Sequence, residues 1–158
     1  MELSKAESVA NQTEAEIRDL IVGTWKLVST EETLKDGSTR PFPVFGPYAT
    51  GFLMYQRDGY MCAVIANPDR VKWANTAHAT PEEKLAADRG TLAYGGRYEI
   101  DVKQKQIIHL PEVASDPAYV GSRQVRPYRL DGSLLVFSDV ENDHPSVARW
   151  KIVWKKIQ

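Results

Sequence analysis

Apolar and polar residues alternate with a period of two at both ends of this chain. From Gly23 to Glu31, odd-numbered residues fall on one face of an extended chain and even-numbered residues on the other. The same alternation returns near the C-terminus, where Trp150, Ile152 and Trp154 share a face. The pattern therefore predicts a β-strand at each end.

Turn residues divide the middle of the chain into short segments. Asp58-Gly59 and Asp131-Gly132 are dipeptides typical of β-hairpins. Residues 40–50 hold three prolines and cannot form a central strand. The predicted strands are residues 23–31, 51–56, 60–65, 92–102, 105–110, 122–130, 133–138 and 147–157.

Two segments carry helix signals instead. Thr13 and Glu16 have the spacing of a capping box, which predicts a short helix to about Leu20. The run from Thr80 to Glu83 repeats that spacing, with proline at the first helical position. Gly90 is expected to end this second helix, near residues 81–89, in the left-handed conformation.

Eight sequential strands with tight turns predict an all-β, eight-stranded, up-and-down antiparallel barrel, because closure removes exposed sheet edges. A barrel of this size is wide enough to hold one small ligand. A flattened sandwich is the competing interpretation. We expect residues 1–12 to form a flexible N-terminus and residues 13–158 to form one domain.

Several motifs together resemble a known family. They are GTWKLVS, PFPVFGP, GFLMYQRDGYM, TPEE, LAYGGRYEI, IIHLPEV, VGSRQVR and RWKIVW, in this order. From about Leu20 to Trp154, the chain resembles the intracellular lipocalin-like domain family of bacteria and fungi. The resemblance implies that the first helix plugs the barrel floor, with Gly23 and Trp25 at the closed end. It also implies, by analogy with similar barrels, cyclisation or isomerisation in natural-product pathways.

The composition of the chain limits which classes of binding partner are expected. The chain has 158 residues, 42% of them hydrophobic, and a net charge of −1 from 20 basic and 21 acidic residues. No basic face is implied, which argues against nucleic acid and anionic membranes as partners. Cys62 is the only cysteine, and the N-terminal segment has no apolar signal core. We therefore expect a cytoplasmic location, and a homodimer stays open.

His109 is the first candidate for an acid–base residue. It lies in the apolar run KQIIHLPEV, on one strand face with Ile107 and Pro111. Histidine suits acid–base work near neutral pH, whereas the alternative is a core histidine hydrogen-bonded to a neighbouring strand or tyrosine. Because burial without a partner is costly, we expect His109 to face a cavity shared with Arg126.

Arg126 shares a predicted strand face with Gln124 and Tyr128. A buried arginine needs a carboxylate partner or an anionic ligand. Ligand binding and an internal ion pair with Glu31 or Glu99 are both open. Glu31 is itself either a general base near the barrel mouth or a solvated rim charge.

Aromatic residues supply the remaining candidates. Tyrosine combines an apolar body with a polar tip, which suits a flat, oxygenated ligand, although an ordinary aromatic core is the alternative. Aromatic residues in segments 42–48 and 66–90 predict a lid over the mouth, or merely a cap on a filled core. The predicted acid–base residues are His109, Arg126, Glu31 and Tyr98. The predicted ligand contacts are Tyr60, Tyr94, Gln124, Tyr128, Trp150, Phe45 and Trp73.

No metal or cofactor is expected. His109 and Glu112 lie three apart and would face opposite sides of a strand, and the other candidate ligands lack zinc spacing. The chain has no glycine-rich phosphate loop and no G-x-S-x-G motif.

Three functions follow from this sequence. The first is a cofactor-free isomerase or cyclase acting on a small, apolar, oxygenated molecule. The second is a noncatalytic carrier or sensor that uses the same pocket. The third is a structural barrel with a filled interior.

Overall fold

The computed structural model describes residues 12–158, so the predicted flexible segment 1–12 lies almost wholly outside the described residues. The helical elements are α2 (Glu14–Ile21), η1 (Thr76–His78), α3 (Pro81–Arg89) and η2 (Pro117–Tyr119). The strands are β1 (Gly23–Leu34), β2 (Thr39–Arg40), β3 (Thr50–Tyr55), β4 (Tyr60–Ala66), β5 (Thr91–Asp101), β6 (Gln106–Ala114), β7 (Gln124–Asp131), β8 (Leu134–Val140) and β9 (Val147–Lys156).

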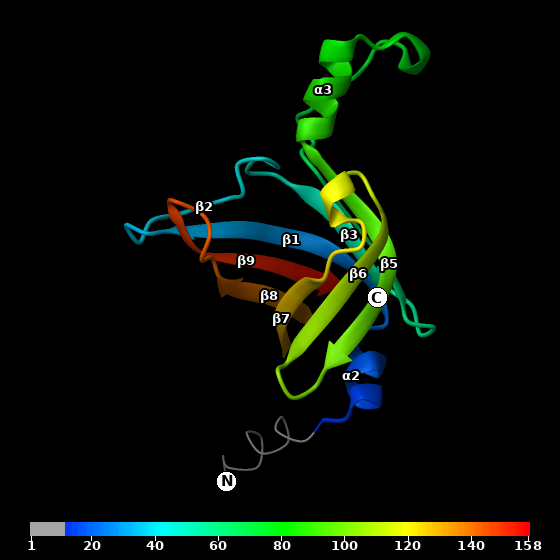
Figure 1. The fold of residues 1–158 in the computed structure, drawn as a ribbon, viewed down its shortest axis with the longest axis vertical. Coiled ribbons are helices and arrows are strands. Elements are labelled where there is room, and N and C mark those ends of the chain that lie inside the picture. Colours follow the sequence, from blue (N-terminus) through cyan, green and yellow to red (C-terminus); the bar gives the residue numbers. More distant parts are fainter. Residues whose placement is uncertain (1–11) are drawn as a thin grey trace.

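The strands form a closed antiparallel barrel (Figure 1). From β3 to β9 each strand pairs with the next one along the chain, while β1 pairs with both β3 and β9. The eight long strands are those predicted, and only the two-residue β2 was missed. The up-and-down barrel is therefore confirmed and the flattened sandwich was wrong.

Helix α2 closes one end of the barrel (Figure 1). It begins with the predicted capping box between Thr13 and Glu16 and buries Ile17 and Ile21. Trp25 is 1% exposed, and its indole Nε1 donates a hydrogen bond to the Ile21 carbonyl at 2.7 Å. This end is a packed floor, as the lipocalin-like pattern implied.

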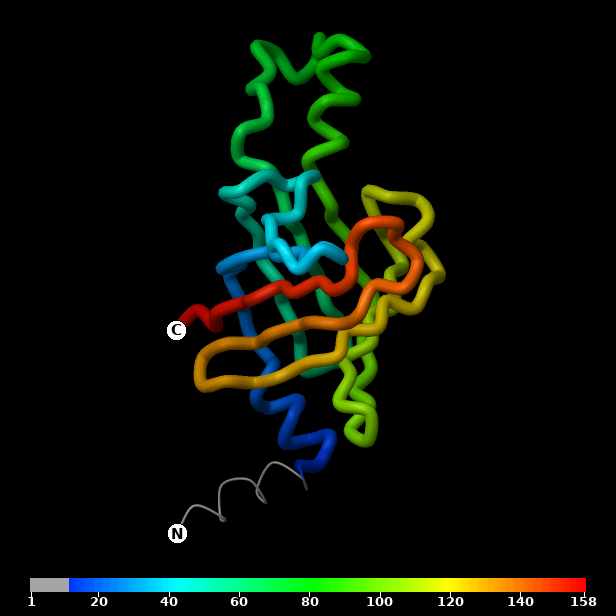
Figure 2. Tube along the Cα trace, turned by 90° about the vertical axis from the view of Figure 1, so that its left-hand side faces the viewer, coloured from blue at the N-terminus to red at the C-terminus, as the bar shows by residue number. Residues whose placement is uncertain are grey.

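The segment between β4 and β5 forms an arm that extends away from the barrel (Figures 1 and 2). Helix α3 begins with the predicted capping box, but Gly90 ends it with φ of −103°, outside the left-handed region. Trp73 donates to the Glu83 carbonyl within this arm, at 3.3 Å. The predicted helix exists, but it does not lie across the mouth as a lid.

Every helix among the described residues is too short or too polar to cross a membrane.

A β-bulge in β1 changes which residues face the interior. The pairing of β1 with β9 shifts register between Leu27 and Ser29, so one extra residue is accommodated there. Beyond the bulge Thr30 is buried, and Glu32 rather than Glu31 lines the interior. The predicted inner face was therefore wrong beyond Leu27, because an inserted residue reverses the alternation.

The core fills the barrel only at the α2 end. Large buried side chains meet there from several strands and from α2: Ile17, Ile21, Trp25, Tyr55, Ile107 and Leu135. On the same strands, interior residues further from α2 line a cavity instead. The predicted alternative of a filled interior was therefore wrong.

We expect Trp25→Ala to lower the free energy of unfolding by about 3–5 kcal/mol, because it removes a fully buried aromatic ring and its hydrogen bond. Urea unfolding followed by circular dichroism measures the change. Trp73→Ala in the arm is the control, with a much smaller expected effect. Equal effects of the two substitutions would contradict a packed floor at Trp25.

Candidate ligand-binding site

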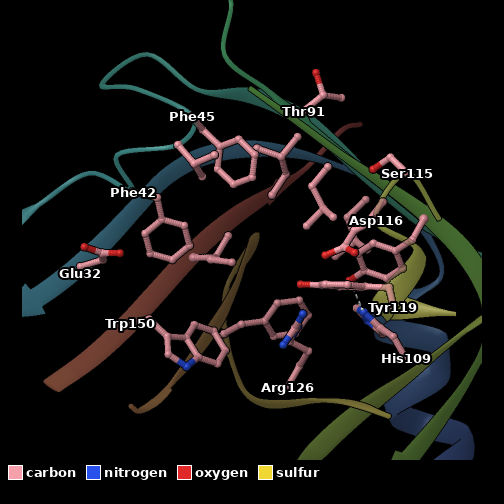
Figure 3. A pocket seen from close by; sticks show the side chains of 18 of the residues that line it. Glu32, Phe42, Phe45, Thr91, His109, Ser115, Asp116, Tyr119, Arg126 and Trp150 are labelled. Carbon is pink, nitrogen blue, oxygen red and sulfur yellow. Dashed lines mark hydrogen bonds between the residues drawn. The ribbon is translucent and has the colours of Figure 1, made fainter. Parts of the chain in front are cut away.

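The barrel contains a cavity of about 570 Å³ at the end opposite α2. Its walls are mostly apolar, and its rim includes the charged residues Glu32, Asp88, Asp116 and Glu141. Figure 3 shows Glu32 and Asp116 among them. Asp88 and Asp116 are exposed, so this rim meets solvent. Cavities of this size and character are typical of small-molecule sites.

The bulge in β1 also holds the proline-rich loop at the mouth. It turns Thr30 inward, where the hydroxyl accepts a hydrogen bond from the Phe42 backbone N–H at 3.1 Å. Phe42 and Phe45 thereby line the cavity (Figure 3). On the neighbouring strand β9, which pairs with β1, alternation contributes Trp150 and Ile152 to the lining.

His109 lies at the deep end of the cavity and is only 1% exposed. Its Nε2 is 2.5 Å from the Tyr55 hydroxyl, and its Nδ1 is 2.8 Å from the Tyr94 hydroxyl. Burial, and to a smaller extent the charge of Arg126, holds the pKa of His109 well below its usual range. The imidazole is therefore neutral near pH 7, with one nitrogen donating and the other accepting.

The two tyrosine partners stay protonated. Burial raises the pKa of Tyr55 well above its usual value and raises the pKa of Tyr94 as well. The positive charge of Arg126 partly opposes the rise at Tyr94. Tyr55, His109 and Tyr94 thus form a neutral hydrogen-bonded chain that ends at a cavity-lining hydroxyl.

Arg126 projects into the cavity from β7 (Figure 3). Its guanidinium carbon lies 5.6 Å from the ring centroid of Trp150. Its side-chain hydrogen bonds are long, at 3.5 Å to the Val125 carbonyl and 3.3 Å to Gln124 Oε1. Within residues 12–158 it forms no ion pair, so neither Glu31 nor Glu99 serves as the internal partner.

Two predicted acid–base residues lie elsewhere. Glu31 faces outward and pairs with Lys151 at 3.2 Å. Tyr98 is buried toward α2, where its hydroxyl donates to the Gln56 carbonyl and accepts from Arg18. Neither residue lines the cavity, so both assignments to the site were wrong.

The predicted ligand contacts divide into two groups. Tyr94, Trp150 and Phe45 line the cavity. Four others do not: Tyr60, Trp73, Gln124 and Tyr128. Gln124 instead contacts Arg126 and donates to Ser122, and Tyr128 packs against the core.

Tyr60 faces outward, contrary to the prediction, and so does Cys62 two residues along β4. Tyr60 is 41% exposed, and both residues line an apolar groove on the outer surface of β3 to β6. Both faces of β4 are apolar, so alternation could not indicate which face is inside.

Sequence reasoning missed several residues that surround the cavity. They include Tyr55, which supports His109, and the lining residues Glu32, Asp116, Tyr119, Glu141 and His144. Tyr55 shares the buried face of β3 with Leu53, but the outer face carries the apolar residues Phe52 and Met54, so alternation could not indicate which face is inside. The loop residues carried no sequence pattern that would place them at the cavity.

Across residues 12–158, no three His, Cys, Asp or Glu side chains are grouped as metal ligands.

A closed eight-stranded barrel with an apolar cavity at one end defines a small-molecule-binding barrel. Residues 22–157 match the lipocalin-like domain model, and the chain belongs to this family. One relative is a protein of Aspergillus oryzae named 4'-hydroxy-3'-methoxypropiophenone carrier protein. It is 32% identical over 89 residues, which span 49% of this chain and 78% of the relative.

The pKa of His109 predicts how stability depends on pH. An unfolded histidine protonates near pH 6.5, whereas buried His109 resists protonation until lower pH. Below about pH 6.5 the unfolded state therefore binds more protons than the folded state, and the stabilisation by neutral His109 is lost. We expect the free energy of unfolding to fall by up to about 1.4 kcal/mol per pH unit from this group.

His109→Gln should remove this part of the slope between pH 7.5 and 5.5 in denaturant titrations. His78→Gln, which changes an exposed histidine in η1, is the control and should leave the slope intact. An unchanged slope in His109→Gln would show that His109 is not held neutral.

Proposed function

We propose that this protein binds one small, flat, mostly apolar and oxygen-bearing molecule in the barrel cavity and acts as its carrier. The observation that supports this most directly is the cavity of about 570 Å³ with aromatic walls and a single guanidinium inside. Apolar walls favour burial of an apolar ligand body, and few polar groups fix its orientation.

The aromatic side chains are arranged for a flat ligand. Phe42, Phe45 and Trp150 lie on one side of the cavity and Tyr119 lies on the other (Figure 3). Tyr94 lies beside Tyr119, with 5.3 Å between the two ring centroids. Aromatic rings favour offset or edge contacts with another ring, beyond the gain from burial alone. A ring held between these walls would place its substituents near Arg126.

The named relative supports a carrier role. Its printed ligand is an aryl ketone with hydroxyl and methoxy substituents, which combines an aromatic body with oxygen atoms. The same combination suits the walls and the guanidinium of this cavity. We therefore propose an aryl ketone or a similar substituted aromatic molecule as the ligand class.

Binding is tested by titrating 4'-hydroxy-3'-methoxypropiophenone and following tryptophan fluorescence. Trp150 and Trp154 line the cavity, so a saturable change is expected. Ala63→Phe places a ring in the cavity and should weaken binding at least tenfold. Val64→Phe, the outward-facing neighbour on β4, is the control and should bind normally.

Equal binding by the two variants would contradict a ligand site inside the barrel. The melting temperature of each variant is measured alongside, so that loss of binding is not confused with unfolding.

Proton-transfer catalysis is a second candidate, favoured by the hydrogen-bonded chain of Tyr55, His109 and Tyr94 beside Arg126. Such a chain could move a proton to or from a bound carbonyl compound, as an isomerase or cyclase requires. We place it second because the depressed pKa of His109 makes the imidazole a weak base and both ring nitrogens are already occupied.

Hydrogen exchange distinguishes the carrier from the enzyme. An acid–base catalyst would accelerate the replacement of hydrogen by deuterium at the carbon beside the ketone of the bound aryl ketone in D₂O, which NMR detects. A carrier leaves this rate at its value in buffer, and that is the result we expect. Acceleration in the native protein that is lost in His109→Gln would favour the enzyme.

A further inference from the structure

We propose that Arg126 and the Tyr94 hydroxyl form an oxyanion site, and that the ligand is a weakly acidic phenol or enol bound as its anion. This inference rests on the proposed binding of a small molecule in the cavity and specifies the chemistry of that molecule.

The unpaired charge of Arg126 is the first support. Arginine stays protonated at all ordinary pH values, and a partly desolvated cation is costly without an anion. Its interactions with the protein are long hydrogen bonds to uncharged oxygens and a cation–π contact with Trp150, while no ion pair is formed among residues 12–158. An anionic oxygen in the cavity would supply the missing partner.

The direction of the buried hydrogen bonds is the second support. The Tyr55 hydroxyl has His109 Nε2 as its one hydrogen-bond partner among the described residues, so its proton is satisfied only by donation there. Neutral His109 then carries its proton on Nδ1 and donates it to the Tyr94 oxygen. The Tyr94 O–H is left to donate to a group in the cavity.

Arg126 and Tyr94 therefore direct hydrogen-bond donors, a charged guanidinium and a neutral hydroxyl, toward the same part of the cavity. Both side chains line the cavity, and the charge of Arg126 is close enough to Tyr94 to oppose the burial-induced rise of its pKa. Donors that converge in a partly dehydrated site favour an oxygen carrying negative charge over a neutral one.

The charges at the rim favour a weak acid over a carboxylate. Arg126 is the only lysine or arginine among the described lining residues. Of the rim carboxylates, Glu32 is paired with Arg40 at 2.9 Å, and Asp88, Asp116 and Glu141 supply the remaining negative charge. The titratable and charged groups lining the cavity are Glu32, Asp88, Tyr94, His109, Asp116, Tyr119, Arg126, Glu141 and His144. A ligand that is already anionic in water meets this negative rim, whereas a neutral phenol passes it and ionises inside.

Ionisation must release one proton. The O–H bond of the phenol breaks, its electron pair stays on the oxygen beside Arg126, and the proton leaves through the mouth to the buffer. His109 does not take the proton, because both of its ring nitrogens are engaged by tyrosines. Binding of the neutral phenol is therefore coupled to release of one proton.

The test compares 4-nitrophenol with its methyl ether, 4-nitroanisole, which has no acidic proton. The neutral and ionised forms of 4-nitrophenol have different absorption spectra, so its pKa can be measured when it is bound to the native protein. We expect both compounds to bind and the pKa of bound 4-nitrophenol to fall by about one unit or more, a tenfold shift in ionisation.

Arg126→Met should return the pKa to the value in water or above it, while 4-nitroanisole still binds. Arg126→Lys should restore part of the shift, since it keeps the charge. Arg129→Met removes an exposed arginine of the same strand, paired with Asp131, and should leave the shift unchanged.

If both compounds bind equally well and the pKa of 4-nitrophenol is unaltered, the oxyanion site is refuted and the binding function stands. If neither compound binds saturably, the proposed binding function fails, and the oxyanion site fails with it. A shift that persists in Arg126→Met would also overturn the assignment of Arg126.

Discussion

The pairing of β1 with β9 is the contact on which the rest of this structure depends. It joins the first and last long strands, with Leu27 opposite Trp154 and Glu32 opposite Trp150, and so converts a sheet into a barrel. Closure gives the sheet an inside, which α2 and Trp25 fill at one end. The bulge within the same pairing turns Thr30 inward, and Thr30 holds the loop that forms the cavity mouth.

The layer of Tyr55, His109 and Tyr94 lies between the packed floor and the cavity. It satisfies both ring nitrogens of a buried histidine, so this polar group is hydrogen-bonded on both sides within an otherwise apolar core. Keeping His109 neutral also leaves Arg126 as the one permanent cation in the lining. The same layer of residues therefore stabilises the core and borders the binding site. The proposed ligand chemistry follows from the distribution of charge there, with a neutral histidine and one permanent cation.

Local signals in the sequence predicted most of the fold. Period-two alternation, the Asp-Gly dipeptides and the capping boxes are each decided by a few neighbouring residues, and all correspond to observed elements. The site was less predictable because its contacts are long-range: Tyr55 and His109 are 54 positions apart. Glu31 was misplaced because a bulge leaves no periodic signal, and Tyr60 because both faces of its strand are apolar.

A crystal structure of the protein with 4'-hydroxy-3'-methoxypropiophenone would show directly whether the ligand lies inside the barrel. We expect electron density for one molecule inside the barrel, with its ring beside Trp150 and its hydroxyl oxygen within hydrogen-bond distance of Arg126 and Tyr94. Density only in the outer groove near Tyr60, or an empty barrel at saturating ligand concentration, would contradict this expectation.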